Sequence, residues 1–340
     1  MRKLLNTLYI TTPEAYLSKD GMNVVVSINK EERFRIPIIN VEGIVTFGYM
    51  GASPGLMKLC VDNNVSLTFM TPQGRFIARV QGTTHGNVLL RKKQYTLADD
   101  ENVALHLAKL FITGKVFNAR SVLLRFVRDN GSHEEVELAA KQLDWHRRGI
   151  ERVDNMESLR GEEGRAANVY FGVFDYLILH QKDDFAFHGR SRRPPKDEVN
   201  AMLSFVYTLL ANEVAAALES VGLDPYVGFM HTLRPGRTSL ALDMMEELRP
   251  YLADRLVLSL INRRQVTGKD FIRQGDNSFV MNDGCRKNLL TAWQSRKKDT
   301  IEHPYLKEKI PIGLLPYTQA MLLARFLRDD LDDYPVFLMR

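Results

Sequence analysis

The 340-residue sequence predicts an α+β protein with two domains, a β-rich N-terminal sheet or sandwich domain (1–86) and an all-α C-terminal domain (87–340). Three observations support this prediction. Residues 1–82 contain short segments rich in Val, Ile, Tyr, Phe and Thr, and turn residues separate these segments, as is typical of strands. From about residue 87 onward, long segments carry apolar residues at helical spacing. The length of the chain also exceeds that of one ordinary domain.

The N-terminal domain is expected to contain seven short strands and one helix. The helix is predicted from Pro54 to about Asn63, because proline is favoured in the first turn of a helix. The predicted strands are 4–11, 15–18, 22–29, 33–39, 41–48, 65–71 and 75–81. Turn residues such as Lys19-Asp20-Gly21 separate them. This part of the sequence has no cluster of His, Cys or acidic residues, so we assign it to structure, dimerisation and partner contacts.

The C-terminal domain is expected to begin after the glycine-containing stretch 82–86. Val103, Leu107, Leu110 and Phe111 illustrate the helical spacing of its apolar residues. The predicted helices are 87–97, 100–129, 133–149, 151–160, 163–180, 197–219, 240–262 and 315–330. The acidic stretch 329–333 near the C-terminus is expected to be peripheral.

Composition and charge indicate an ordinary globular protein with a basic bias. Hydrophobic residues make up 45% of the chain and charged residues 26%, and the net charge is +5. The segment from Arg263 to Lys298 has nine Lys and Arg residues against three Asp, a local excess of 9 − 3 = +6. This segment is either a solvated face or a surface that binds a polyanion such as nucleic acid.

The sequence predicts a soluble cytoplasmic protein with no membrane association. Cys60 and Cys285 are far apart and belong to no metal-ligand spacing, which fits a reducing compartment. Polar residues interrupt the apolar run near the N-terminus, so we expect no signal peptide. We also find no apolar run that approaches the roughly 18 residues needed for a membrane span.

The stretch from Gly222 to Pro250, GLDPYVGFMHTLRPGRTSLALDMMEELRP, concentrates residues that can do chemistry. His231 is followed by a basic loop and then by a predicted helix that carries Asp243 and Glu246. These two carboxylates are three residues apart, so they project from the same helical face. Carboxylates with one histidine suit Mg²⁺ or Mn²⁺. The alternative is that the acidic residues only complement the positive end of the helix dipole.

A second unusual stretch runs from Arg160 to Phe171 and contains the sequence GEEGRAANVYF. If it is helical, Glu163 and Tyr170 share one face. Gly164 costs about 1 kcal/mol relative to alanine inside a helix, so the close approach of another helix is expected. Glu163 is then a carboxylate delivered to the same cavity as His231 and Glu246. The alternative is a tightly packed bundle helix with a solvated glutamate.

Three segments in order, EEGRAANVYF, RRPPKDEVNAMLSFVYTLL and GLDPYVGFMHTLRPGRTSLALDMMEELRPYLADR, together resemble Cas1, the CRISPR-associated endonuclease and integrase family. The segment GIVTFGYMGASPGLMKLCVDNNVSLTFMTPQGRF also resembles the N-terminal half of that family. The resemblance therefore covers essentially the whole chain. Three motifs with family-like order and spacing make it specific.

The resemblance implies a set of site residues. Glu163, His231 and Glu246 match the metal-binding and catalytic positions of the family, and Asp243 matches an acidic position that is sometimes treated as a fourth ligand. The neighbouring carboxylates Glu162 and Glu247 are expected to point away from this face.

The resemblance also implies a function. It implies a Mg²⁺- or Mn²⁺-dependent DNA endonuclease and integrase, active in antiviral defence in the prokaryotic cytoplasm. Captured foreign DNA would be inserted as a spacer by transesterification, in which a 3′-hydroxyl attacks a phosphodiester at the end of a CRISPR repeat. The expected partners are double-stranded DNA (prespacer and repeat), a second copy of the chain in a homodimer, and the small protein Cas2.

DNA affinity is expected to come from phosphate contacts, with some stacking. The candidate residues are Arg192, Arg193, Arg234, Arg237 and Tyr170. Four different functions still compete with this one. A metal-dependent hydrolase of small molecules or an iron oxygenase fits less well, because the motif stretches contain only one histidine. A non-catalytic DNA-binding scaffold and a branched-DNA repair nuclease both remain compatible with the residues.

Overall fold

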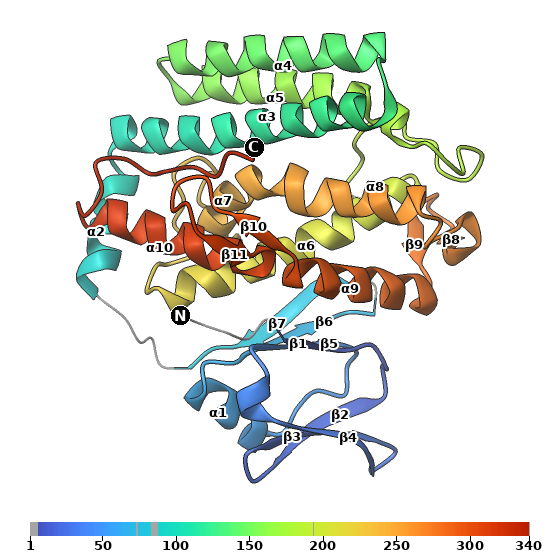
Figure 1. Ribbon diagram of the computed structural model, residues 1–340. Coiled ribbons are helices and arrows are strands. Elements are labelled where there is room, and N and C mark those ends of the chain that lie inside the picture. Colours follow the sequence, from blue (N-terminus) through green and yellow to red (C-terminus); the bar gives the residue numbers. More distant parts are fainter. Residues whose placement is uncertain (1–5, 73, 83–87, 193, 340) are drawn as a thin grey trace. The chain divides into compact units, whose positions relative to one another are not determined.

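The computed structural model describes residues 6–72, 74–82, 88–192 and 194–339 (Figure 1). Contacts divide the chain into two compact units. The first unit comprises Met1–His85, Val280–Asp299 and Pro311–Leu314, and the second comprises Gly86–Phe279, Thr300–Ile310 and Leu315–Arg340. Each unit is therefore discontinuous in sequence, whereas the sequence predicts two consecutive domains. The predicted boundary at residue 86 lies outside the described residues.

A four-stranded sheet forms part of the first unit, with the strand order β1-β5-β6-β7. Its strands are β1 (Thr7–Ile10), β5 (Gly43–Phe47), β6 (Ser66–Met70) and β7 (Phe76–Val80). β1, β5 and β6 are parallel, and β7 is antiparallel to β6. Parallel neighbours need a crossover connection. Helix α1 (Pro54–Asp62) lies in the connection between β5 and β6, and Ser53 caps its N-terminus.

An antiparallel meander forms the second sheet of this unit, with strands β2 (Ala15–Asp20), β3 (Asn23–Ile28) and β4 (Glu31–Pro37). Asn29 and Lys30 connect β3 and β4, and both have positive φ angles, 53° and 67°, as a two-residue type I′ turn requires. The other elements of this part of the fold are η1 (Ile38–Asn40), β9 (Phe279–Met281), α9 (Asp283–Lys298) and η5 (Ile312–Leu314). Within the described residues, each predicted strand segment overlaps an observed strand, and the predicted helix at 54–63 is confirmed; residues 4 and 5 of the first predicted segment lie outside the described residues.

The second unit is mainly helical, and three of its helices form a layer in which α3, α4 and α5 pack together (Figure 1). These are α3 (Glu101–Asn130), α4 (Glu134–Arg152) and α5 (Met156–Gly172). α7 (Ser239–Arg249) packs against α3, and α6 (Glu198–Ser220) packs against α7. The remaining elements are α2 (Val88–Ala98), η2 (Phe174–Leu177), η3 (Pro250–Asp254), α8 (Arg255–Asn262), η4 (Gly268–Asp270), β8 (Phe271–Arg273), β10 (Thr300–Glu302), β11 (Lys309–Pro311) and α10 (Leu315–Leu327). The predicted α+β fold class is thus confirmed.

Several helix boundaries differ from the prediction for identifiable reasons. The predicted helices 151–160 and 163–180 are replaced by the single helix α5, because Asn155 caps a start at Met156 and accepts a hydrogen bond from the backbone N–H of Ser158. The predicted helix 240–262 contains the π-helical turn η3, which begins at Pro250. Proline has no N–H to donate, so the regular hydrogen-bond pattern is interrupted there. The short strands β8 to β11 were not predicted.

Helix α6 is long and apolar enough to span a membrane by composition, with a mean hydropathy of 1.5 over an 18-residue window. The expectation that no apolar run approaches this length is therefore wrong for α6. However, 61% of that window is buried inside the protein. This burial is the property of a core helix.

The end of the chain returns to the helical core. The acidic stretch 329–333 is largely exposed, as predicted, but Tyr334, Phe337 and Met339 are buried. Asn118 on α3 donates hydrogen bonds to the carbonyl oxygens of Glu247 and Phe337 and accepts one from the backbone N–H of Met339. The C-terminal segment therefore ties α3 to α7.

Candidate active site

Helices α3, α5 and α7 bring two of the predicted acidic residues together. Glu163 on α5 and Glu246 on α7 both form ion pairs with Nζ of Lys115 on α3, and the distance from Nζ to Glu246 Oε2 is 2.9 Å. The side chains of Lys115, Glu163 and Glu246 are only 12%, 23% and 7% exposed. Water screens such partly buried charges poorly. The two carboxylates therefore converge on one cationic position.

Asp243 holds His231 in a fixed orientation. The distance from His231 Nδ1 to Asp243 Oδ1 is 2.6 Å, and the Asp243 side chain is fully buried. With a proton on Nδ1 that is donated to the carboxylate, Nε2 is the nitrogen with a free lone pair. His231 also lies close enough to Glu246 that its imidazole, when protonated, helps to lower the pKa of that carboxyl. The predicted histidine therefore belongs to the same site as Glu246.

Asp243 also organises the loop that carries His231. Its carboxylate accepts hydrogen bonds from the backbone N–H groups of Phe229, Met230 and His231. Gly228 makes this contact possible, because a Cβ atom there would lie 2.5 Å from Asp243 Oδ2 and 2.8 Å from a backbone carbon of α7. Both oxygens of Asp243 are therefore used within the protein, and the geometry favours a positioning role over the predicted direct metal contact.

A second cation fixes Glu246. Arg249 donates a hydrogen bond of 2.6 Å to Glu246 Oε1, one turn away on the same helix. Burial acts to raise the pKa of Glu246, but the charges of Arg249 and Lys115 outweigh burial and hold this pKa well below its usual range. Glu246 therefore stays anionic at neutral pH, as a ligand for a cation must.

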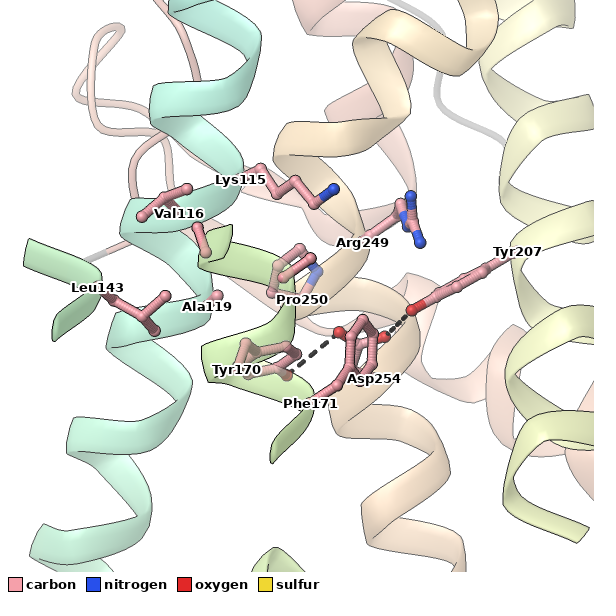
Figure 2. A pocket seen from close by; sticks show the side chains of 12 residues that line it. Lys115, Val116, Ala119, Leu143, Tyr170, Phe171, Tyr207, Arg249, Pro250 and Asp254 are labelled. Atoms are coloured by element: carbon pink, nitrogen blue, oxygen red, sulfur yellow. Dashed lines mark hydrogen bonds between the residues drawn. The ribbon is translucent and has the colours of Figure 1, made fainter. Parts of the chain in front are cut away.

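A buried polar network of Tyr207, Tyr170 and Asp254 packs against Arg249. The guanidinium of Arg249 lies 4.2 Å from the centre of the Tyr207 ring. Tyr207 and Tyr170 donate hydrogen bonds of 2.6 and 3.1 Å to the two oxygens of Asp254 (Figure 2). All four side chains line a small cavity, as does Lys115. The π-helical turn η3 follows Arg249 directly and ends at Asp254, and such turns are frequent at functional sites.

The predicted role of Tyr170 in DNA binding is wrong. The side chain is 4% exposed, and its hydroxyl group is committed to Asp254. Burial and the nearby Asp254 charge raise its pKa well above the usual value. A base cannot stack on a ring that lies inside the helical core.

The predicted arginine contacts lie in different environments. Arg192 and Arg234 are exposed and therefore available to a phosphate. Arg237 is half-buried in the loop before α7. Arg193 lies outside the described residues.

The two acidic neighbours that the sequence sets aside do point elsewhere. Glu162 accepts a hydrogen bond from Arg165 and contacts His146 Nδ1 at 2.8 Å. Glu247 is fully buried and contacts Tyr334 and the backbone N–H of Phe337 in the C-terminal segment. Both carboxylates are therefore engaged away from Lys115.

The donor set fits a divalent ion, although it is not assembled as a ligand cluster. Within residues 6–72, 74–82, 88–192 and 194–339, no three His, Cys, Asp or Glu side chains are gathered closely enough to hold a metal. However, Glu163 and Glu246 face one cation, and His231 has its Nδ1 held by a carboxylate, as is usual for metal-binding histidines. Oxygen donors with one imidazole suit Mg²⁺ or Mn²⁺. The fit requires Lys115 to move.

Two cations of the site, Lys115 and Arg249, were not among the residues predicted from the sequence. A signal for Lys115 was present, because it lies in a predicted helix among apolar residues such as Ile112 and Ala119, three and four positions away. A lysine on an apolar helix face is rarely buried without a partner. Arg249 lies three residues after Glu246 and so shares its helical face.

Comparison with known proteins connects this site to a family. The model of the family described as CRISPR associated protein Cas1 matches residues 8–295. The chain is 49% identical to CRISPR-associated endonuclease Cas1 1 of Chlorobaculum tepidum, with both chains covered completely. It is also 49% identical to CRISPR-associated endonuclease Cas1 2 of Rhodospirillum rubrum, over 98% of each chain.

Solved structures share the fold. A casposase bound to its integration product has a TM-score of 0.83 at 22% identity, with 98% of this chain and 95% of the casposase chain covered. A Cas6-RT-Cas1–Cas2 complex also has a TM-score of 0.83, at 21% identity, and the match covers all of this chain and 37% of the other. The family match and the full-length relatives together show that this chain belongs to the Cas1 family of CRISPR-associated proteins.

Proposed function

We propose that this chain is a divalent-metal-dependent DNA endonuclease and integrase that inserts captured foreign DNA into a CRISPR array as new spacers. The observation that carries the proposal is the convergence of Glu163 and Glu246 on one cationic position beside His231, whose orientation Asp243 fixes. Two further findings support it. Full-length relatives are named CRISPR-associated endonucleases, and a structure with the same fold is a casposase bound to its integration product.

Glu163, Glu246 and His231 would hold Mg²⁺ or Mn²⁺, with Nε2 as the histidine donor. When bound, such an ion polarises a phosphoryl oxygen and lowers the pKa of the attacking hydroxyl group. The chain's own residues prepare the site. Arg249 keeps Glu246 anionic and fixed, and Asp243 keeps the His231 ring in one orientation.

The reaction we propose is a transesterification. The 3′-hydroxyl oxygen of the captured strand forms a bond to the phosphorus at the end of a repeat, and that hydroxyl loses its proton. The bond from the same phosphorus to the leaving 3′-oxygen of the repeat strand breaks, and the leaving oxygen takes up a proton. Water in place of the attacking hydroxyl gives hydrolysis, which accounts for nuclease activity at the same site.

The proposed partners are double-stranded DNA, a second copy of this chain and Cas2, in a prokaryotic cytoplasm. A solved Cas6-RT-Cas1–Cas2 complex contains a chain with this fold, which supports Cas2 as a partner. Exposed arginines such as Arg192 and Arg234 would contact DNA phosphates. The affinity for DNA is therefore expected to fall steeply as salt increases.

The test uses the full-length protein, a labelled duplex with free 3′-hydroxyls and a supercoiled plasmid, with Mg²⁺, Mn²⁺ or EDTA, and with or without Cas2. We expect metal-dependent nicking and strand joining in the wild-type protein and in His180→Ala, which changes an exposed histidine on another loop. His231→Ala should lose both products. DNA binding without any metal-dependent product would favour a scaffold. Cleavage of branched DNA without strand joining would favour a repair nuclease.

A further inference from the structure

We propose that Lys115 is the resident counter-ion of the metal-free site and that a divalent ion must displace its ammonium group in order to bind. Lys115 then lowers the affinity of the site for metal and keeps the empty site folded. This inference rests on the function proposed above, because it takes Glu163, Glu246 and His231 as the metal site.

The charge of Lys115 compensates the negative charges of Glu163 and Glu246. It lies on the inner side of α3, and its helical neighbours Phe111, Ile112 and Ala119 are all buried and apolar. Its ammonium group pairs with both Glu163 and Glu246. Without this cation, two largely buried carboxylates from different helices would face each other, and such an uncompensated pair strongly destabilises a fold.

The ammonium group and a divalent ion cannot share the position between the two carboxylates. They are both positive, and both need the same carboxylate oxygens. Lys115 can leave without movement of α3, because its charge lies at the end of a flexible four-carbon stem. The contacts of Glu163, which is the most exposed of the three side chains at 23%, then become available to an ion.

Arg249 provides an internal contrast. It also pairs with Glu246, but through the other carboxylate oxygen, at 2.6 Å. Its guanidinium is stacked on Tyr207, which is in turn hydrogen-bonded to Asp254 (Figure 2). Arg249 is therefore held both by an ion pair and by a ring, whereas the contacts of the Lys115 ammonium group among the described residues are its ion pairs with the two carboxylates. We infer that Arg249 stays in place and that Lys115 is the cation that moves.

The experiment measures Mn²⁺ binding by full-length protein without DNA, from the electron paramagnetic resonance signal of free Mn²⁺. Lys115→Met removes the charge and keeps the length of the side chain, and Lys141→Met, on the exposed face of α4, makes the same change in net charge elsewhere. We expect Lys115→Met to bind Mn²⁺ at least about tenfold more tightly than the wild type, since the competing cation is gone. Lys141→Met should match the wild type.

Thermal unfolding gives a second measurement on the same proteins. Metal-free Lys115→Met should unfold at a lower temperature than the wild type, and Mn²⁺ should raise its unfolding temperature by more than it raises that of the wild type. A purely structural role for Lys115 predicts a lower unfolding temperature with unchanged or weaker Mn²⁺ binding. That result would overturn the inference.

Two controls separate failure of this inference from failure of the proposed function. Glu163→Gln should abolish Mn²⁺ binding. If it binds Mn²⁺ as the wild type does, the proposed metal site itself is wrong, and the role of Lys115 falls with it. If Glu163→Gln loses binding while Lys115→Met gains none, only the inference about Lys115 is wrong.

A measurement on the wild-type protein covers the case in which Lys115→Met does not fold. In protein with ¹³C-labelled lysine, the Lys115 side-chain signal is identified by its absence in Lys115→Arg. Saturating Mg²⁺ should shift this signal towards that of a solvated lysine, over the same concentration range in which Mg²⁺ stabilises the protein. A Lys115 signal that does not change would contradict displacement.

Discussion

Glu246 and Glu247 are adjacent on α7 and are both buried, yet their surroundings are opposite. Glu246 faces two cations, Lys115 and Arg249. Glu247 faces neutral donors, which are the hydroxyl of Tyr334 and the backbone N–H of Phe337, each at 2.5 Å, and the side-chain amide of Gln319. The cations hold the pKa of Glu246 well below its usual range, whereas burial raises the pKa of Glu247 to about 7 despite its hydrogen bonds.

The comparison shows that burial alone does not indicate what an acidic residue does. Adjacent residues on a helix point roughly 100° apart, so one carboxylate can face a reaction site while its neighbour faces the core. Cationic partners keep Glu246 charged and therefore able to bind an ion. Neutral partners make Glu247 an anchor for the C-terminal segment. Substitutions that affect one face of α7 should therefore leave the other largely unchanged.

The largest effect is expected for Glu246→Gln against Glu247→Gln. Glu246→Gln should lower metal-dependent strand joining by more than about 100-fold, because loss of an outer-shell partner alone costs about 10- to 100-fold. Glu247→Gln should keep most of the activity in the same assay, since its carboxylate is engaged by the C-terminal segment and faces away from the proposed site. Equal losses in the two variants, with both proteins folded, would show that the two faces of α7 are not independent.

A smaller loss of activity is expected for Asp243→Asn. The asparagine side chain has one acceptor oxygen, whereas the Asp243 carboxylate has two. It therefore cannot accept hydrogen bonds from His231 Nδ1 and from all three backbone N–H groups, and the imidazole ring loses its fixed orientation. Activity and Mn²⁺ affinity should fall by about 10- to 100-fold, the range seen for outer-shell partners of metal ligands. Calorimetry of Mn²⁺ binding and the joining assay check this together. If Asp243 were itself a ligand, the variant should instead match Glu246→Gln.

The pH dependence of the unfolding free energy reports on Glu247, on the face of α7 that points away from the proposed site. The pKa of Glu247 rises from 4.5 to about 7 on folding, so the folded chain retains a proton that the unfolded chain releases. Its contribution to stability is therefore complete below about pH 4.5 and is lost as the pH rises through about 7. Glu246 does the reverse, because its pKa is lowered, and it contributes across the whole neutral range.

We therefore expect the unfolding temperature of the wild type to fall by at least about 2 °C more than that of Glu247→Gln between pH 5 and pH 8. Thermal unfolding of both proteins at matched ionic strength measures the difference. Any other groups that titrate in this range are the same in both proteins. Parallel pH profiles would show that Glu247 is ionised throughout.

The sequence predicted the elements better than it predicted the polar partners. Alternating apolar residues and turn signals locate the strands, because their spacing is a local property. The grouping of Val280–Asp299 with the N-terminal unit depends on long-range contacts that spacing does not contain. Glu163, His231 and Glu246 came from the residue chemistry of two stretches and from resemblance to a family, whereas Lys115 and Arg249 came only from the structure. Tyr170 was misassigned because the spacing of an aromatic residue in a helix does not show whether its hydroxyl group is exposed to solvent or, as here, hydrogen-bonded to a buried residue such as Asp254.

The smallest effect is expected for the network around Arg249, where Asp254 is the fourth buried carboxyl group of α7 and its continuation, after Asp243, Glu246 and Glu247. Burial raises its pKa, and its closest partners are the neutral hydroxyls of Tyr207 and Tyr170, so it resembles Glu247 more than Glu246. Each Tyr→Phe change removes one donor from a buried carboxyl, which costs about 1–3 kcal/mol. Tyr207→Phe should cost more than Tyr170→Phe, since its hydrogen bond is shorter, 2.6 against 3.1 Å.

Urea denaturation measures both variants against Tyr226→Phe, a change at an exposed ring. Mn²⁺ binding should stay close to that of the wild type in all three proteins, because Arg249 keeps its direct contact with Glu246. A marked loss of Mn²⁺ affinity in Tyr207→Phe would instead mean that Arg249 needs the Tyr207–Asp254 contact in order to hold Glu246. Asp254 would then belong with the residues that position Glu246, and the neutral surroundings of Asp254 would not be independent of the proposed site in the way that those of Glu247 are.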